Sequence, residues 1–447
     1  MKKYLSICVL IWLLSPQSAF SYGKFQLGSY GRVGISSDEN GARGGASQIT
    51  PFGPRLIETS YLELDFQVSE SVSKLGNVSI LSTLAFGDAL FHDNGQWQAQ
   101  MALRRFQLAI RGIYGTRWYA IVGSQWNRGD DIYLMNFWPL DDLNSNGGTV
   151  GFDGERWQLM IHSGVNRLAD PSQNLRRPVA APFFGAVDAQ IVDRQRFVNA
   201  LSLTRKFGKR QKVKLYSEFH YLPGRFVPIE ERPEVSEFLS DDLGYMFGAQ
   251  YGIWGFGDQG HLNVFVRAAK GLAAYDELEI ARAVNADRRS VDARELRLAL
   301  SANFETEYLS LMTGGYVRSF VDGDVNEQDF DDRNEGALSV RPMLRLGHFT
   351  PAVEASVQMS RPNGVDPRTN EQSIARVVQI GFIPAWSLTS DKPSAYSRPQ
   401  LRAIAACSFL NEAALSRFAE ADPRSQRPRV WYFGLGAEWW FGRGGGY

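Results

Sequence analysis

The chain has 447 residues, of which 44% are hydrophobic and 13% aromatic, with 43 Gly and two Cys. This apolar content excludes an intrinsically disordered chain and a collagen-like fibre, and the low cysteine count excludes a small disulfide-stapled scaffold. The 48 Lys and Arg residues balance the 48 Asp and Glu residues, so no overall charge recruits nucleic acid or anionic lipid.

Residues 1–21 are typical of a secretory signal peptide that is cleaved on export. Lys2 and Lys3 form a basic start, residues 5–14 form an apolar stretch, and residues 19–21 supply a small-x-small cleavage site. The apolar run is shorter than the roughly 18 residues that a spanning helix needs. Cleavage also removes Cys8, so the mature chain keeps Cys407 alone and forms no disulfide within itself.

The mature chain repeats one pattern, in which about ten residues of apolar–polar alternation are followed by a turn or a polar loop. Alternation of this kind predicts strands whose successive side chains point to opposite faces. The pattern is clear over residues 26–34, 61–68, 213–221, 261–270, 353–359 and 431–441.

A soluble sandwich would also alternate, but three features favour a membrane barrel. The chain has no Pro/Ser-rich hinge that would divide it into domains, its polar faces carry charge on many strands, and its apolar faces end in aromatic residues, as in 431–441. Outer-membrane barrels place apolar side chains toward lipid, polar ones toward the lumen and aromatic girdles at the interfaces. We therefore predict an all-β, transmembrane antiparallel β-barrel over residues 22–441 in the bacterial outer membrane, followed by a short Gly-rich tail at 442–447.

The length predicts a wide barrel. At roughly 10 residues per strand plus connections, the mature chain supports about 16 to 18 strands, and barrels of that size enclose an aqueous channel. The long polar stretches are predicted to be extracellular loops: 38–54, 166–194, 226–242 and 321–335. Two aromatics, Phe441 and Tyr447, remain candidates for the assembly signal at the end of the barrel.

The motifs for catalysis or cofactor binding are weak. Residues 255–260 match a dinucleotide fingerprint, but they lie between two alternating segments, so a hairpin turn is favoured. Asp322, Asp324 and Asn326 have the opening spacing of a calcium loop, but Glu327 replaces the required Gly, so a solvated acidic loop is favoured. Without a nucleophile signature we predict no enzyme, no cofactor and no metal.

The inward faces place aromatic rings beside Arg and Glu. Tyr30 shares a face with Arg32, Tyr61 with Glu63, Phe265 with Arg267, and Trp440 with Glu438. The C–H faces of a sugar ring stack on flat apolar rings, while its hydroxyl groups bind charged or amide partners. A file of rings flanked by charged groups suits an oligosaccharide that moves lengthwise through the pore.

These residues make the chain similar to the maltoporins, the sugar-specific porins. The resemblance is spread over nearly the whole mature chain, with local matches in the right order at residues 28–34, 58–64, 128–137, 396–402 and 436–441. It implies a homotrimer of 18-stranded barrels in outer-membrane lipid and lipopolysaccharide. In each barrel, a line of aromatic side chains guides maltodextrins and polar residues beside it bind hydroxyl groups. The family often has a cysteine pair in its first loop, which this chain lacks.

Carried over by local match, the resemblance implies individual roles. Residues 128–148 resemble the loop that folds inward and makes the constriction, where Trp138 would replace a tyrosine of the family, with a register uncertain by one position. Of the Arg104/Arg105 pair, alternation favours Arg105 as the inward residue. The implied aromatic slide is Tyr30, Tyr61, Phe265, Tyr396 and Trp440, and the implied polar track and constriction are Arg32, Arg55, Glu63, Arg105, Arg128, Asp131 and Trp138.

The sequence thus predicts a carbohydrate-selective outer-membrane channel for facilitated diffusion of oligosaccharides. The alternative is a porin with no sugar preference or with one for another solute. An enzyme or an adhesin built on a barrel is a third, weaker interpretation.

Overall fold

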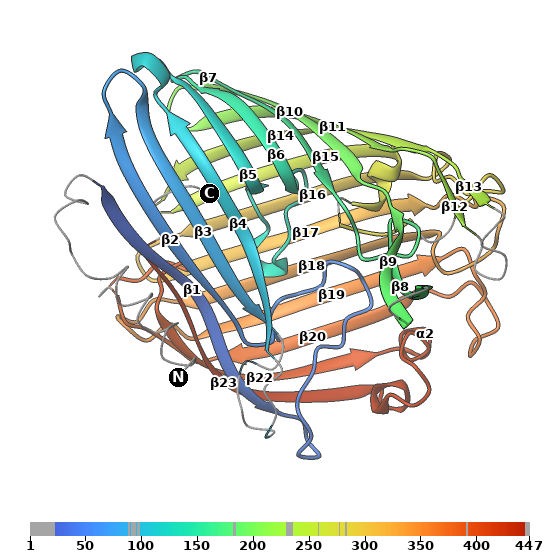
Figure 1. Ribbon diagram of the computed structural model, residues 1–447. Helices are drawn as coiled ribbons and strands as arrows, with labels where there is room; N and C mark the ends of the chain where they lie inside the picture. Colours follow the sequence, from blue (N-terminus) through green and yellow to red (C-terminus); the bar gives the residue numbers. More distant parts are fainter. Residues whose placement is uncertain are drawn as a thin grey trace, which may run out of the picture.

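A computed structural model describes residues 23–87, 90, 95, 99–181, 185–228, 236–257, 259–276, 278–281, 284–389 and 392–442. Within these residues the main sheet has nineteen strand segments. Two of them, β20 and β21, are one strand interrupted at Pro384, so the wall has eighteen antiparallel strands. The last strand pairs with the first, with Tyr30 opposite Trp440, and this pairing closes the barrel (Figure 1).

The barrel strands follow one another around the wall in chain order. They are β1 Lys24–Ser37, β2 Tyr61–Val72, β3 Gly76–Gly87, β4 Gln100–Arg111, β5 Trp118–Arg128, β6 Asp142–Asp153, β7 Trp157–Asn166, β10 Arg196–Phe207, β11 Gln211–Leu222, β14 Asp242–Phe256, β15 Gly260–Gly271, β16 Arg294–Glu305, β17 Leu309–Val321, β18 Arg333–Leu344, β19 Ala352–Pro362, β20 Ala375–Ile383, β21 Ala385–Ser387, β22 Gln400–Leu410 and β23 Arg429–Phe441.

Burial follows the predicted alternation. On β16, Leu296, Leu298 and Leu300 are exposed on the outside, whereas Glu295 and Arg297, which alternate with them, are at most 4% exposed. This arrangement exposes apolar side chains on the outside and covers charged ones on the inside, the reverse of a soluble protein. The predicted closed antiparallel barrel with an apolar outer face is therefore confirmed.

Long loops at one end alternate with short turns at the other. Two of the predicted extracellular loops contain hairpins, β8 Asn174–Ala181 with β9 Gly185–Asp193 and β12 Arg225–Pro228 with β13 Ser236–Leu239. Short helical turns complete the connections: η2 Ile113–Gly115, η3 Tyr133–Met135, η4 Leu272–Tyr275, α2 Glu412–Leu415 and η5 Pro423–Gln426.

The first loop differs from the expectation that residues 38–54 are simply extracellular. Phe52 stacks on Phe137 with ring centroids 3.8 Å apart, and Thr50 hydrogen-bonds to Gln358 of β19. The loop (blue, between β1 and β2 in Figure 1) therefore folds back against the inside of the wall. It does so because its apolar residues find partners there that water cannot offer.

The predicted leader, residues 1–21, lies outside the described residues, as does all of the predicted tail except Gly442. No helix among the described residues is long and apolar enough to cross a bilayer.

Candidate functional site

The constriction loop, residues 129–141, leaves β5 and folds into the barrel before β6 begins. Its apolar side chains Ile132 and Leu140 are at most 1% exposed. Glycines in the facing strands make room for them. A Cβ added at Gly314 of β17 would lie 2.3 Å from Ile132 Cγ2, and one at Gly248 of β14 would lie 2.3 Å from Leu140 Cδ1. The loop therefore packs against the inner faces of β14 and β17, which confirms the predicted inward fold.

Ion pairs fix both ends of the constriction loop. Asp130 pairs with Lys212 of β11 at 2.5 Å, and Asp141 pairs with Lys214 of the same strand. Burial disfavours the charged form of Asp130, but the Lys212 ammonium outweighs burial, so the pKa of Asp130 lies below its ordinary value. Asp130 therefore stays ionised and holds the loop at neutral pH.

Glu438 of β23 is the centre of a polar cluster on the inner face of the barrel. Its side chain is fully buried. Arg398 donates to its Oε2 at 2.8 Å and Arg55 of the first loop to its Oε1 at 2.9 Å. Tyr133 of the constriction loop donates its hydroxyl to Oε2 at 2.9 Å. A buried carboxylate requires such partners, so this one residue joins the wall to both inward-folded loops.

Three aromatic rings lie on three neighbouring strands of the inner face. Trp440 of β23 is directly opposite Tyr30 of β1, and the Tyr30 and Tyr61 ring centroids are 6.0 Å apart. The Arg32 guanidinium lies 5.2 Å from the centroid of the Tyr61 ring. All four side chains are partly exposed. The rings therefore form a row across β23, β1 and β2 that a solute can touch.

Tyr61 connects this row to alternating arginine and tryptophan side chains. Arg104 donates to the Tyr61 hydroxyl at 2.5 Å, and its guanidinium lies 3.5 Å from the centroid of a Trp126 ring. The Arg128 guanidinium lies 3.9 Å from the Trp126 centroid and 3.6 Å from that of Trp138. Cation–π contacts of this kind hold the rings in fixed orientations.

Both arginines of the 104/105 pair point into the barrel. Arg105 hydrogen-bonds to Thr83 at 2.9 Å, while Arg104 pairs with Glu63 at 2.6 Å. The register between β3 and β4 shifts just after Thr83, and a bulge places two successive residues on the same side of a strand. The prediction that Arg105 alone faces inward is therefore wrong.

Two further slide candidates differ from the others. Phe265 points inward, as alternation predicts, but is only 1% exposed and packs in the apolar cluster beneath the constriction loop. Its ring offers no face to a solute, which corrects its expected place in the slide. Tyr396 lies in the connection between β21 and β22 rather than on a strand, with its ring centroid 5.4 Å from that of Tyr133. Its ring therefore lies beside the constriction loop.

We call the resulting set the lumenal row. Its members are Tyr396, Trp440, Tyr30, Tyr61, Arg104, Trp126, Arg128 and Trp138. From Trp440 to Trp138 they are joined by strand register, a ring contact, a hydrogen bond and cation–π contacts, while Tyr396 is linked to Trp440 through Tyr133 and Arg398.

Three arginines on the inner face of β15, β16 and β17 are buried. Arg267, Arg297 and Arg318 face one another across β15, β16 and β17 and are at most 7% exposed. Asp276 pairs with Arg267 at 2.6 Å, and Glu295 pairs with Arg297 at 2.7 Å. These arginines are buried and paired, so they hold the fold together.

Sequence reasoning did not single out Tyr133, Trp126 or Arg104. Tyr133 lies within the constriction loop and Trp126 near the end of β5, where alternation gives no sign of direction. Arg104 sits at the bulge. A rule based only on parity cannot find residues at places where the pleat is broken.

A LamB porin family model matches residues 25–441 of the chain. None of the curated proteins matches it.

Solved structures resemble the fold at low sequence identity. Acinetobacter baumannii OccAB1 has a TM-score of 0.52 and 10% identity, over 96% of this chain and 100% of that chain. Pseudomonas aeruginosa OccD3 (OpdP) has a TM-score of 0.46 and 10% identity, over 94% and 91%. P. aeruginosa OccK2 (OpdF) in complex with glucuronate has a TM-score of 0.47 and 10% identity, over 94% and 98%. The likeness to OccAB1 concerns the fold alone.

Proposed function

The chain belongs to the LamB porin family, and from this membership we propose that it is a sugar-selective diffusion channel whose solute slides along the lumenal row. It is an outer-membrane porin channel, and the proposal concerns what it selects. The observation that carries the proposal is the series of partly exposed rings and guanidinium groups from Trp440 to Trp138, to which Tyr396 is linked through Tyr133 and Arg398.

The charges beside the row favour a neutral solute. Each arginine has a carboxylate partner nearby, so the row carries little uncompensated charge that would select an ion. At the same time the paired groups still offer oxygen acceptors and N–H donors to hydroxyl groups. The pairs are Arg32–Glu58 at 3.2 Å, Arg55–Glu438 at 2.9 Å, Arg104–Glu63 at 2.6 Å, Arg105–Asp65 at 2.9 Å, and Arg128–Asp142.

Transport in this proposal needs no covalent chemistry. Several weak sites in series bind a solute well enough to admit it and loosely enough to release it. Successive rings 6.0 Å apart, such as Tyr30 and Tyr61, allow one sugar unit to leave a ring while the next unit arrives. The family and the fold indicate a channel, and the proposed solute is an oligosaccharide of the maltodextrin type.

The test is sugar block of the ion current in planar bilayers. Maltooligosaccharides are titrated against the wild-type chain, Tyr61→Ala and Trp440→Ala. We expect wild-type block at millimolar sugar or below, and a loss of block of roughly fivefold in each variant, because one stacked ring contributes about 1 kcal/mol. Open-channel conductance should change much less.

The matched control is Phe433→Ala, because Phe433 lies on the same strand as Trp440 but faces outward and is 46% exposed. It should leave sugar block unchanged. If neither maltooligosaccharides nor a panel of other neutral sugars blocks the wild-type current, the sugar proposal fails and the alternative of a porin without sugar preference takes its place.

A further inference from the structure

The loop between β17 and β18, residues 322–332, concentrates negative charge. It contains six acidic residues and neither Lys nor Arg. One carboxylate oxygen from each of Asp322, Asp324 and Asp329 lies within 4.8 Å of the other two. Three like charges at that spacing repel one another unless a cation or protons compensate them.

Asp322 supplies an observation that the charge count alone does not. It is only 1% exposed, and its Oδ2 is buried with no hydrogen-bond partner among the described residues. A buried carboxylate oxygen normally has a donor or a cation beside it. The expectation of a fully solvated acidic loop is therefore wrong at Asp322, because the loop folds back and covers this side chain.

We propose that Asp322, Asp324 and Asp329 bind a calcium ion. Calcium takes six to eight oxygen ligands at about 2.3–2.6 Å, so two ligand oxygens lie at most about 5 Å apart, and the three carboxylates satisfy that limit as they stand. The carboxylate oxygens suit a hard cation, and the remaining positions would be filled by water.

The neighbouring Arg333 does not compensate the charge of these three carboxylates. Arg333 pairs with Glu335 at 2.7 Å and with Asp331 at 3.9 Å, and no ion pair of Arg333 reaches Asp322, Asp324 or Asp329 among the described residues. The three carboxylates are thus left to an external ion.

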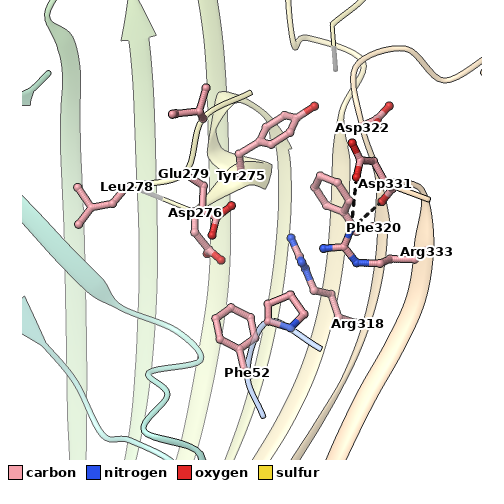
Figure 2. A pocket seen from close by; sticks show the side chains of 12 residues that line it. Phe52, Tyr275, Asp276, Leu278, Glu279, Arg318, Phe320, Asp322, Asp331 and Arg333 are labelled. Carbon is pink, nitrogen blue, oxygen red and sulfur yellow. Dashed lines mark hydrogen bonds and ion pairs between the residues drawn. The ribbon is translucent and has the colours of Figure 1, made fainter. Parts of the chain in front are cut away.

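The site lies where two long loops meet. The backbone N–H of Gly323 donates to the Tyr275 hydroxyl at 3.0 Å, which links the loop to η4. Beside it is a cavity of about 420 Å³ lined by Phe52, Tyr275, Arg318 and Asp322, among others (Figure 2). Calcium would therefore order the 322–332 loop, which the Gly323–Tyr275 hydrogen bond connects to η4.

The experiment is a metal titration of the full chain, refolded in detergent without lipopolysaccharide and stripped with chelator. Terbium(III), a luminescent substitute for calcium, is excited through tyrosine, and calcium and magnesium are then added as competitors. Since Tyr275 contacts the loop, we expect sensitised emission, displacement by calcium with an apparent Kd of about 10⁻⁴ to 10⁻³ M as in extracellular sites, and at least tenfold weaker displacement by magnesium.

Three variants make the result specific. Asp322→Asn and Asp324→Asn should each weaken terbium and calcium binding at least tenfold. Asp331→Asn, an exposed acid of the same loop outside the group of three, should change it less than twofold. Heat-modifiable gel mobility and circular dichroism show that each variant has formed the barrel. Absence of calcium-displaceable emission from the wild type, or equal binding by a correctly folded Asp322→Asn chain, overturns the proposal.

Discussion

At the scale of single residues, burial separates side chains that have the same chemistry. Tyr30 and Phe265 both point into the barrel, but Tyr30 is partly exposed while the constriction loop covers Phe265. Arg32 borders the lumenal row, whereas Arg297 is 1% exposed and paired with Glu295. An inward aromatic or arginine is therefore a candidate for solute contact only where loops leave it uncovered.

Removing the charge of Glu438 should destabilise the barrel strongly. Glu438→Gln leaves Arg398 and Arg55 without their buried carboxylate partner, and breaking a buried pair costs about 3–5 kcal/mol. Urea unfolding in detergent measures this loss in the free energy of unfolding. The control is Asp153→Asn, which breaks a half-exposed pair with Arg111 and should cost at most about 1 kcal/mol. A similar loss in both variants would contradict the central role of Glu438.

Asp131 should make ion selectivity depend on pH. Burial raises the pKa of Asp131 to about 6, with Arg55 only partly opposing the rise. The carboxyl group is then charged above that pH and neutral below it, so acidification removes one negative charge from the constriction. We expect the reversal potential in a salt gradient to shift toward anions between pH 7 and pH 5. Asp131→Asn should lack that step, and an identical pH profile in both proteins would rule out this group.

At the scale of elements, most strands are regular, and the inward-folded loops determine the shape of the pore. Gly314 of β17 and Gly248 of β14 allow the loop to fold inward, because their missing side chains leave room for Ile132 and Leu140. The bulge in β4 has a similar effect, since it turns a second arginine toward Tyr61. Small departures from regular strands therefore shape the lumen.

Gly314→Ala should displace the constriction loop. The added Cβ would lie 2.3 Å from Ile132 Cγ2, which is shorter than a van der Waals contact allows. The loop must therefore move away from β17. We expect single-channel conductance to change by at least about a third and sugar block to weaken several-fold. Gly148→Ala is the control, because its Cβ would meet nothing closer than 3.9 Å. If the two variants conduct alike, the loop does not depend on this glycine.

At the scale of the whole molecule, the closed wall leaves no free sheet edge, as a strand-built membrane protein requires. The resemblance to maltoporins further implies a homotrimer. We expect the refolded chain to have three times the protomer mass by light scattering in mild detergent, and to become monomeric on boiling in dodecyl sulfate. A single-chain mass in mild detergent across the micromolar range would contradict the trimer.

The sequence by itself determined the two faces of the regularly alternating barrel strands. A pleated strand has only two sides, so alternation at residues such as 431–441 specifies which side chains meet lipid and which meet water. Alternation also located Tyr30, Tyr61 and Trp440 on the inner face, where the structure places them.

Only the tertiary structure decided which inward residues are accessible. The side chains that cover Phe265, pair with Glu438 or approach Tyr61 come from loops and strands far away in the chain. Their directions are set by packing, by a bulge and by glycines that leave space, and none of these follows a two-residue period. Where the backbone departs from the regular pleat, local sequence no longer specifies what a side chain touches.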